Sequence, residues 1–520
     1  MPKYIPYNYN QHSMVVINYQ EQLQPGTFEH AIHFLIENKL DLSIFYPNYK
    51  NDNEGRPAYD PAILLKIILF AYSKGITSSR EIERCCETNI IFKALSCDTV
   101  PHFTTIASFV SSHAKEIENL FEQILLICDE QGLLGHELFA IDGCKMSSDA
   151  SKEWSGTLKE LQQKRTKLKN LIQHHVSEHK KLDQNESRDD ERIKRTEQSI
   201  NTLDKAYEKI DKFLKIAQPR IGKGKQGKEV KSNITDNESA KMTTSKGTIQ
   251  GYNGIASVDK KHQIIIDAQV FGSGQEQHTL QPVLEAIENR YRRLGFNNHL
   301  YQDDIIVTAD TGFANEDNMK YLIKNKINGY IPDNQFRSRD PKFKDHKIKY
   351  KKKAIKNVES FIGLPASKFN FNTKELTCTY PAGKEISYRG KRVDKNNNIK
   401  VFFEGRLLQC RHCDIKTKCM TNPDAANHRK GNGRQVSFII GKQHKENVTD
   451  WMRERIDSEE GKQIYSHRMS VVEPVFGNIG TNKKLNRFSL RSKNKVQSQW
   501  LMYCLVHNIE KLKNYGKMAA

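Results

Sequence analysis

The chain has 520 residues, and its 82 Lys and Arg against 62 Asp and Glu give a net charge of +20. This length allows about two to four domains with full cores, and the charge favours polyanionic partners such as nucleic acid. No run of about 18 apolar residues occurs and the first residues lack the layout of a secretory signal, which predicts a soluble, cytosolic protein rather than a membrane or secreted one. The ten cysteines therefore predict reduced thiols or metal ligands and not a disulfide framework.

Residues 1–135 are predicted to form a helical N-terminal domain. Between about 25 and 135, apolar residues recur at helical spacing, and each periodic segment begins near a Ser, Thr or Asp. The tight turn from Gly75 to Arg80 suits a helix-turn-helix that reads DNA, with Arg80 as a candidate contact. A helical domain used only for packing fits the same pattern equally well.

The segment 136–154 opens the predicted α/β core with the strand-like run ELFAIDGCK, residues 137–145, in which Asp142 follows the apolar residues. A buried, unpaired carboxylate costs several kcal/mol, so such a group is usually paired, hydrogen-bonded or bound to a metal. Asp142 therefore needs a partner from elsewhere in the chain.

Residues 155–232 are predicted to be an inserted helical hairpin followed by a basic linker. Apolar and amphipathic residues repeat at a 3-4 spacing from Leu158 to Leu182 and again from Ile193 to Ala217, with the polar NESRDDE between them. The predicted product is an antiparallel pair of helices whose basic face could lie along DNA or pair protomers. A solvated structural arm is an equally good interpretation. The GKGKQGKE stretch at 222–229 reads as a flexible linker.

Residues 233–334 are predicted to complete the α/β core. Strand-like runs at 249–259 and 263–272 precede a helix and a last strand that ends at Asp310. Two strands of one sheet that each end in Asp can bring two carboxylates close enough to share a divalent cation. Other acids, among them Asp149, Asp236, Asp267 and Glu276, close no apolar strand and are weaker candidates.

Residues 335–440 are predicted to be a basic, Cys-rich and strand-rich insertion. The stretch RSRDPKFKDHKIKYKKKAIK has ten Lys or Arg against two Asp, and such blocks commonly contact the nucleic-acid backbone, although a solvated charge run is the default. Its candidate DNA contacts include Lys351, Lys352 and Lys353. Downstream, four thiols could hold one tetrahedral zinc, with His412 as a substitute ligand: Cys378, Cys410, Cys413 and Cys419. Scattered reduced cysteines are the alternative.

Residues 441–520 are predicted to return to helix and to carry a third acid, Glu473. Lys484 lies eleven residues further on, close to three helical turns, so it is expected on the same face as Glu473 with Lys483 beside it. That pattern suits a metal ligand next to phosphate contacts, and a surface ion pair would look the same. Pro474 indicates that Glu473 stands near a helix start.

Three motifs together resemble the acidic motifs of bacterial insertion-sequence DDE transposases: Ile-Asp142-Gly, Ala-Asp310-Thr-Gly-Phe, and Tyr465-x2-Arg468 leading into Val-Glu473-Pro-x-Phe-Gly. Residues 58–130 are similar to the InsH-type N-terminal domain of that group, and 137–512 to its catalytic domain. Members with a Cys-bearing insertion between the second Asp and the Glu are especially similar. The resemblance implies an α/β, RNase H-like mixed-sheet core. In one departure, Gly480 stands where related sequences often have Lys.

The resemblance implies DNA cleavage at the element ends and joining of the 3′-OH to target DNA, with two Mg²⁺ or Mn²⁺ ions. Asp142 would bridge both ions, while Asp310 and Glu473 would each complete one. The implied DNA contacts near this site are Tyr465, Arg468, Lys483 and Lys484. Double-stranded DNA and a second copy of the chain on paired ends are the implied partners, in the cytoplasm at the nucleoid. A silent, transposase-derived DNA-binding protein and a two-metal nuclease remain alternatives.

Overall fold

The computed structural model describes most of the chain, namely residues 16–49, 57–183, 190–222, 227–245, 247–302, 305–339, 364, 366–380, 383–393, 399–420, 422–440 and 448–517. It divides into two compact units, the first made of residues 1–334 with 452–520 and the second of 335–451. Lys351, Lys352 and Lys353 lie outside the described residues. Within the described ranges, no helix combines the length and apolarity needed to cross a bilayer.

The first unit begins with a group of helices: α1 (Phe28–Asn38), α2 (Pro61–Ser73), α3 (Ser79–Thr88), α4 (Ile90–Ser96), α5 (Phe103–Ser112) and α6 (Ala114–Glu130). Side-chain oxygens of Thr27 and Asp60 accept backbone N–H groups at the first turns of α1 and α2, as expected of N-cap residues. His113, whose backbone leaves the helical region, separates α5 from α6.

A six-stranded sheet forms the centre of the first unit. Its strands are β1 (Leu138–Ser147), β6 (Ala240–Thr244), β7 (Gly247–Asp259), β8 (Ile265–Phe271), β9 (Ile306–Ala309) and β10 (Asn328–Tyr330). β7 pairs antiparallel with β1, β6 and β8, whereas β9 pairs parallel with both β1 and β10. Leaving β6 aside, the order β8-β7-β1-β9-β10 is that of an RNase H-like core, as the sequence predicted.

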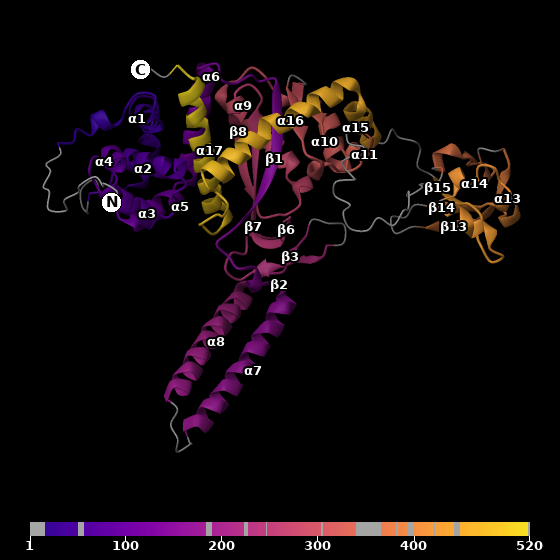
Figure 1. Ribbon diagram of the computed structural model, residues 1–520, viewed down its shortest axis with the longest axis horizontal. Coiled ribbons are helices and arrows are strands. Elements are labelled where there is room, and N and C mark those ends of the chain that lie inside the picture. Colours follow the sequence, from indigo (N-terminus) through magenta and orange to yellow (C-terminus); the bar gives the residue numbers. More distant parts are fainter. Residues whose placement is uncertain are drawn as a thin grey trace, which may run out of the picture. The chain divides into compact units, whose positions relative to one another are not determined.

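The last helix, α17 (Lys493–Tyr515), is buried along most of its length and joins the N-terminal helices to the sheet. It contacts α2 and α6 on one side and β8 on the other, and Figure 1 shows it in yellow between them. The Trp500 indole N–H donates to the Ile255 carbonyl at 3.1 Å. The Gln497 side chain bonds the Val270 N–H and the Ala268 carbonyl, both at 2.7 Å. These bonds fix the helix on the sheet.

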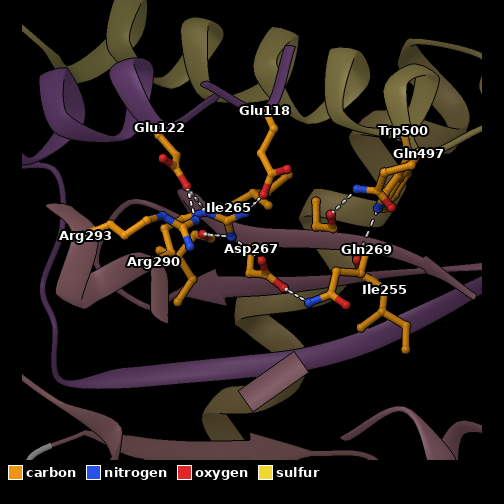
Figure 2. Close-up of polar contacts among 12 residues, drawn as sticks. Glu118, Glu122, Ile255, Ile265, Asp267, Gln269, Arg290, Arg293, Gln497 and Trp500 are labelled. Atoms are coloured by element: carbon orange, nitrogen blue, oxygen red, sulfur yellow. Dashed lines mark hydrogen bonds and ion pairs between the residues drawn. The ribbon is translucent and has the colours of Figure 1, made fainter. Parts of the chain in front are cut away.

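A buried charge network makes a second connection between the N-terminal helices and the core (Figure 2). Arg290, on α9 (Leu280–Leu294), is 4% exposed and forms ion pairs with Asp267 of β8 and with Glu118 and Glu122 of α6. Its guanidinium also lies 5.4 Å from the ring centroid of Phe121. Asp267 thus serves as a structural counterion, which agrees with its weak standing as a candidate site residue.

The predicted hairpin consists of α7 (Leu158–Asp183) and α8 (Asp190–Ile216), which lie side by side in Figure 1. Leu161 and Ile210 are buried, and Arg165 pairs with Asp211 at 2.8 Å. Two short strand pairs lie at its base, β2 (Ser155–Gly156) with β5 (Ser232–Asn233) and β3 (Arg220–Ile221) with β4 (Glu229–Val230). The hairpin is therefore an insertion between β1 and β6 of the sheet.

The second unit is built on a five-stranded antiparallel sheet: β11 (Asn370–Asn372), β12 (Thr377–Thr379), β13 (Glu385–Val393), β14 (Ile399–Glu404) and β15 (Gln435–Ile440). Two short helices, α13 (Leu407–Arg411) and α14 (Lys416–Cys419), lie between β14 and β15. Its core includes Cys378, Val401 and Phe403. The strand-rich character predicted for this region is observed.

Because of His507 on α17, we predict that the first unit loses part of its unfolding free energy when the pH falls. The imidazole is buried, its Nε2–H donates to the Gln263 carbonyl at 2.9 Å, and its Nδ1 lies 3.1 Å from the Asn478 amide. Its pKa is lowered from 6.5 to about 4, mainly by burial and also by the nearby Lys511 and Lys483, against the raising effect of the Gln263 carbonyl and Glu510. The neutral imidazole therefore stabilises the fold above pH 6.5.

This contribution is lost as the pH falls from about 6.5 toward 4, at a rate of about 1.4 kcal/mol per pH unit. Urea denaturation across this range should show a shallower loss of unfolding free energy for His507→Gln than for the wild type. His174→Gln, at an exposed position of α7, should keep the wild-type slope. Equal slopes for all three proteins would contradict the assignment.

Candidate active site

Asp142 and Asp310 lie side by side at one edge of the central sheet. β1 and β9 are parallel neighbours, and their register pairs Ile141 with Ala309. Asp142 and Asp310 are the next residues along these two paths and therefore lie at the same level. β9 ends before Asp310, but β1 continues through Asp142 to Ser147, so the expectation that Asp142 ends its strand was wrong. The structure thus brings together two residues that are 168 positions apart in the sequence.

The surroundings of Asp142 disfavour its negative charge. Burial raises its pKa from 3.8 to about 6, and the charges of Asp310 and Glu276 raise it too. Arg468 and the Gly143 N–H, which donates to Asp142 Oδ1 at 2.8 Å, act in the opposite direction. A carboxylate with unfavourable burial and acidic neighbours binds a cation readily, because the cation relieves both costs.

Arg468 holds the other oxygen of Asp142. Its Nη2 lies 2.7 Å from Asp142 Oδ2, and its side chain is 8% exposed. Its Nε is buried without a hydrogen-bond partner within the described part of the chain. A buried unpaired donor usually marks an acceptor that arrives from outside, and a phosphate oxygen beside Asp142 would satisfy it.

Glu276 also belongs to this site, although sequence reasoning placed it among the weaker candidates. It begins the short helix η4 (Glu276–His278), after β8, and its carboxylate lies against Gly312 of η6 (Thr311–Phe313), two residues beyond Asp310. Its Oε1 lies 3.4 Å from Nζ of Lys145, which is on β1. Four residues separate Glu276 from the end of the apolar strand β8, so strand periodicity gives no signal for it, and only the folded loop brings it to the sheet edge.

Glu473 lies on α16 (Glu459–Gly477), the helix that also carries Arg468 and that packs on β1 and β9. Its side chain is exposed. Pro474 is inside α16 near its end, so the expectation of a helix start was wrong. Glu473 lies about 7.5 Å further along the axis of α16 than Arg468, because it is five residues later in the helix.

The helix does not continue to Lys484, so its expected alignment with Glu473 was also wrong. A π-helical turn, η10 (Asn478–Asn482), follows α16, and Lys484 has a left-handed backbone with φ of 54°. The Lys484 side chain is exposed and packs against Gly75, whose φ of 75° suits glycine. Lys484 is thus near the N-terminal helices.

The remaining DNA-contact candidates have different environments. Arg80 is exposed, with its guanidinium over the Phe103 ring at 4.7 Å, and Tyr465 is half-buried on α16. Lys483 is 1% exposed and pairs with Glu510 at 2.5 Å. A lysine buried in this way is occupied by the fold and does not reach a DNA backbone, which corrects the expectation for Lys483.

Three of the four candidate zinc ligands surround one small cavity in the second unit. Cys410, Cys413 and Cys419 line a space of about 20 Å³ together with Tyr380 and Arg434. The Arg434 N–H donates to Cys410 Sγ at 3.4 Å. Cys378 is buried in the core of the unit and does not line this cavity; burial raises its pKa to about 11. Cys378 therefore does not fit as the fourth ligand.

Neither at the sheet edge nor at the thiol cavity do the possible ligand atoms lie as close together as they would around a bound ion. In the described ranges, only His174, His175 and Glu178 have donor atoms that all lie within 4.8 Å of one another, and they belong to the largely exposed surface of α7. The residues at the sheet edge nevertheless suit a divalent cation, since they offer hard oxygen ligands, and burial together with the charges of Asp310 and Glu276 raises the pKa of Asp142. The thiol cavity has room for a single ion.

Two protein-family models match the chain. Residues 17–112 match a transposase domain (DUF772), and residues 377–513 match a transposase DDE domain. The second match includes Arg468 and Glu473 and begins in the second unit. No curated protein matches the chain in sequence. Transposase domains are thus matched in the N-terminal and C-terminal parts of the chain, with an RNase H-like sheet in the same unit, which is consistent with an insertion-sequence DDE transposase that has an N-terminal domain.

Proposed function

We propose that the chain is an active transposase that cleaves DNA at the ends of an insertion sequence and joins the freed 3′-OH to target DNA. The observation that carries this proposal is the parallel pairing of β1 with β9, which puts Asp142 and Asp310 at one sheet edge. The raised pKa of Asp142 supports it, because this environment favours a bound cation over a bare carboxylate.

In this proposal Asp142, Asp310 and Glu473 hold two Mg²⁺ or Mn²⁺ ions. Divalent ions bound there would activate the attacking water or 3′-OH and stabilise the leaving oxygen. Arg468 keeps Asp142 oriented through its Nη2 and offers its unpaired Nε to a phosphate oxygen. Exposed cations such as Arg80 and Lys484 contact the flanking backbone.

The test is incubation of the purified full chain with DNA carrying both element ends and a plasmid target. Strand-transfer products are expected with Mg²⁺ or Mn²⁺, and none with EDTA or with Glu473→Ala. Native mass spectrometry of the complex on paired ends should show two copies of the chain, since two ends must be held together. Cleavage without joining would instead identify a two-metal nuclease. DNA binding without cleavage would leave a DNA-binding protein, bound at the nucleoid.

We also propose a structural zinc held by Cys410, Cys413 and Cys419, with a fourth ligand other than Cys378. The C-x2-C-x5-C spacing and the shared cavity support it, as does the backbone N–H that Arg434 directs at Cys410 Sγ.

Elemental analysis should find about one zinc per chain, lost in Cys410→Ser and Cys413→Ser. Cys97→Ser, an exposed cysteine of the N-terminal helices, should retain it. Absence of zinc from the wild type prepared without chelator would refute the site.

A further inference from the structure

Lys145 and Glu276 form an ion pair beside the proposed catalytic acids that the reaction outlined above does not use. Lys145 is on β1, three residues beyond Asp142, and β1 continues there past the last residue of β9 that pairs with it. The Nζ of Lys145 lies 3.4 Å from Glu276 Oε1, and the two side chains are 28% and 16% exposed. Lys145 is thus partly accessible at the sheet edge where a DNA strand would lie.

The backbone of η4, which carries Glu276, is held in place by contacts that do not involve Lys145. The Oε2 of Glu276 occupies the space in which a Cβ on residue 312 would stand, so only glycine at that position allows this approach. Thr279 Oγ1 donates to the Glu276 carbonyl at 2.7 Å. Asn315 and Asn318 both donate to the Gln277 carbonyl, at 3.0 and 2.9 Å, and so tie η4 to the loop that follows Asp310.

We propose that Glu276 is a positioning residue that holds the Lys145 ammonium at the Asp142–Asp310 edge, where it binds the phosphate to be cleaved. A lysine has a flexible four-carbon stem, so a fixed carboxylate is needed to keep its charge at one point. Together with Arg468, which pairs with Asp142 Oδ2, the Lys145 ammonium would flank the phosphate and stabilise its developing charge. This inference rests on the proposed function, because it assigns the phosphate to the same site.

The test uses a duplex carrying one element end and measures two properties. Single-turnover cleavage in Mg²⁺ is expected to fall about 100-fold for Lys145→Met, the size typical of losing one charge-stabilising donor, and about 10-fold for Glu276→Gln. The double variant should be no slower than Lys145→Met, since Glu276 acts through Lys145. Lys145→Arg should recover most of the rate. Glu208→Gln, which removes an exposed ion pair with Lys212 on α8, should leave the rate unchanged.

The second property is phosphate-ethylation interference in Ca²⁺, which requires binding and no cleavage. Ethylation of the phosphate at the cleavage position should weaken binding of the wild type, and this penalty should vanish in Lys145→Met and shrink in Glu276→Gln. An unchanged penalty in both variants would overturn the proposal even if the wild type cleaves nothing. Two other results would also overturn the proposal, because Glu276 would then act directly on the reaction. One is a tenfold rise in the Mg²⁺ concentration that Glu276→Gln needs for cleavage. The other is a double variant that cleaves more slowly than Lys145→Met.

Discussion

Asp142→Asn is expected to lower the rate of strand cleavage by about 10³-fold or more while DNA binding changes by less than about threefold. Asparagine keeps the size of the side chain and removes the charged oxygen that a divalent ion needs. Asp310→Asn should behave in the same way. Single-turnover cleavage and filter binding on one end duplex separate the two properties. Equal losses of binding and cleavage would contradict a catalytic role.

The same substitution is expected to raise the stability of the metal-free protein. Because the folded-state pKa of Asp142 is raised from 3.8 to about 6, its contribution to stability is fully present below pH 4 and is lost as the pH rises through 6. At pH 8 in EDTA, Asp142→Asn should therefore increase the unfolding free energy, by an amount on the order of 1–3 kcal/mol.

Asp149→Asn is the control for this stability effect. Asp149 lies just beyond β1, and its two ion pairs, with Arg487 and Arg491, are at the surface and 2.9 Å long. Its replacement should cost about 0–1 kcal/mol. Destabilisation by Asp142→Asn at pH 8 would show that Asp142 serves mainly as the counterion of Arg468.

The pairing of two acids could be predicted because each directly follows an apolar, strand-like run of residues, and such a run is a local property of the sequence. The helical hairpin could be predicted for the same reason, since both of its helices carry a long regular repeat. The RNase H-like strand order came instead from the resemblance carried by the motifs around Asp142, Asp310 and Glu473. These features required no knowledge of how distant loops meet.

The features that sequence reasoning missed depend on long-range contacts or on small backbone departures. Glu276 reaches the sheet edge only because Gly312 leaves room for it and because Asn315 and Asn318 hold its loop. The extrapolation from Glu473 to Lys484 failed because it assumed an uninterrupted helix, whereas a π-helical turn intervenes. Cys378 matched a ligand by composition, yet it does not line the cavity that Cys410, Cys413 and Cys419 share.

Arg290→Met is expected to destabilise the first unit by about 3–5 kcal/mol, the largest stability loss that we predict. Burial lowers the pKa of Arg290, but Asp267, Glu122 and Glu118 outweigh this effect and raise it. Methionine fills a similar volume and leaves the carboxylate of Asp267, which is 1% exposed, without its cation. Urea denaturation followed by Trp500 fluorescence, with Trp154 and Trp451 replaced by Phe, reports on this core.

Arg293→Met is the matched control, because Arg293 pairs with the same Glu122 but is 54% exposed; its loss should be about 0–1 kcal/mol. Adding Asp267→Leu to Arg290→Met should recover much of the stability, since a well-packed apolar pair often equals a buried ion pair. A small effect of Arg290→Met alone would mean that water reaches Asp267.

Because Arg290 connects α6 to β8 and α9, a large effect would mean that the N-terminal helices and the catalytic sheet unfold together. In that case the N-terminal helices are held at a fixed position relative to Asp142.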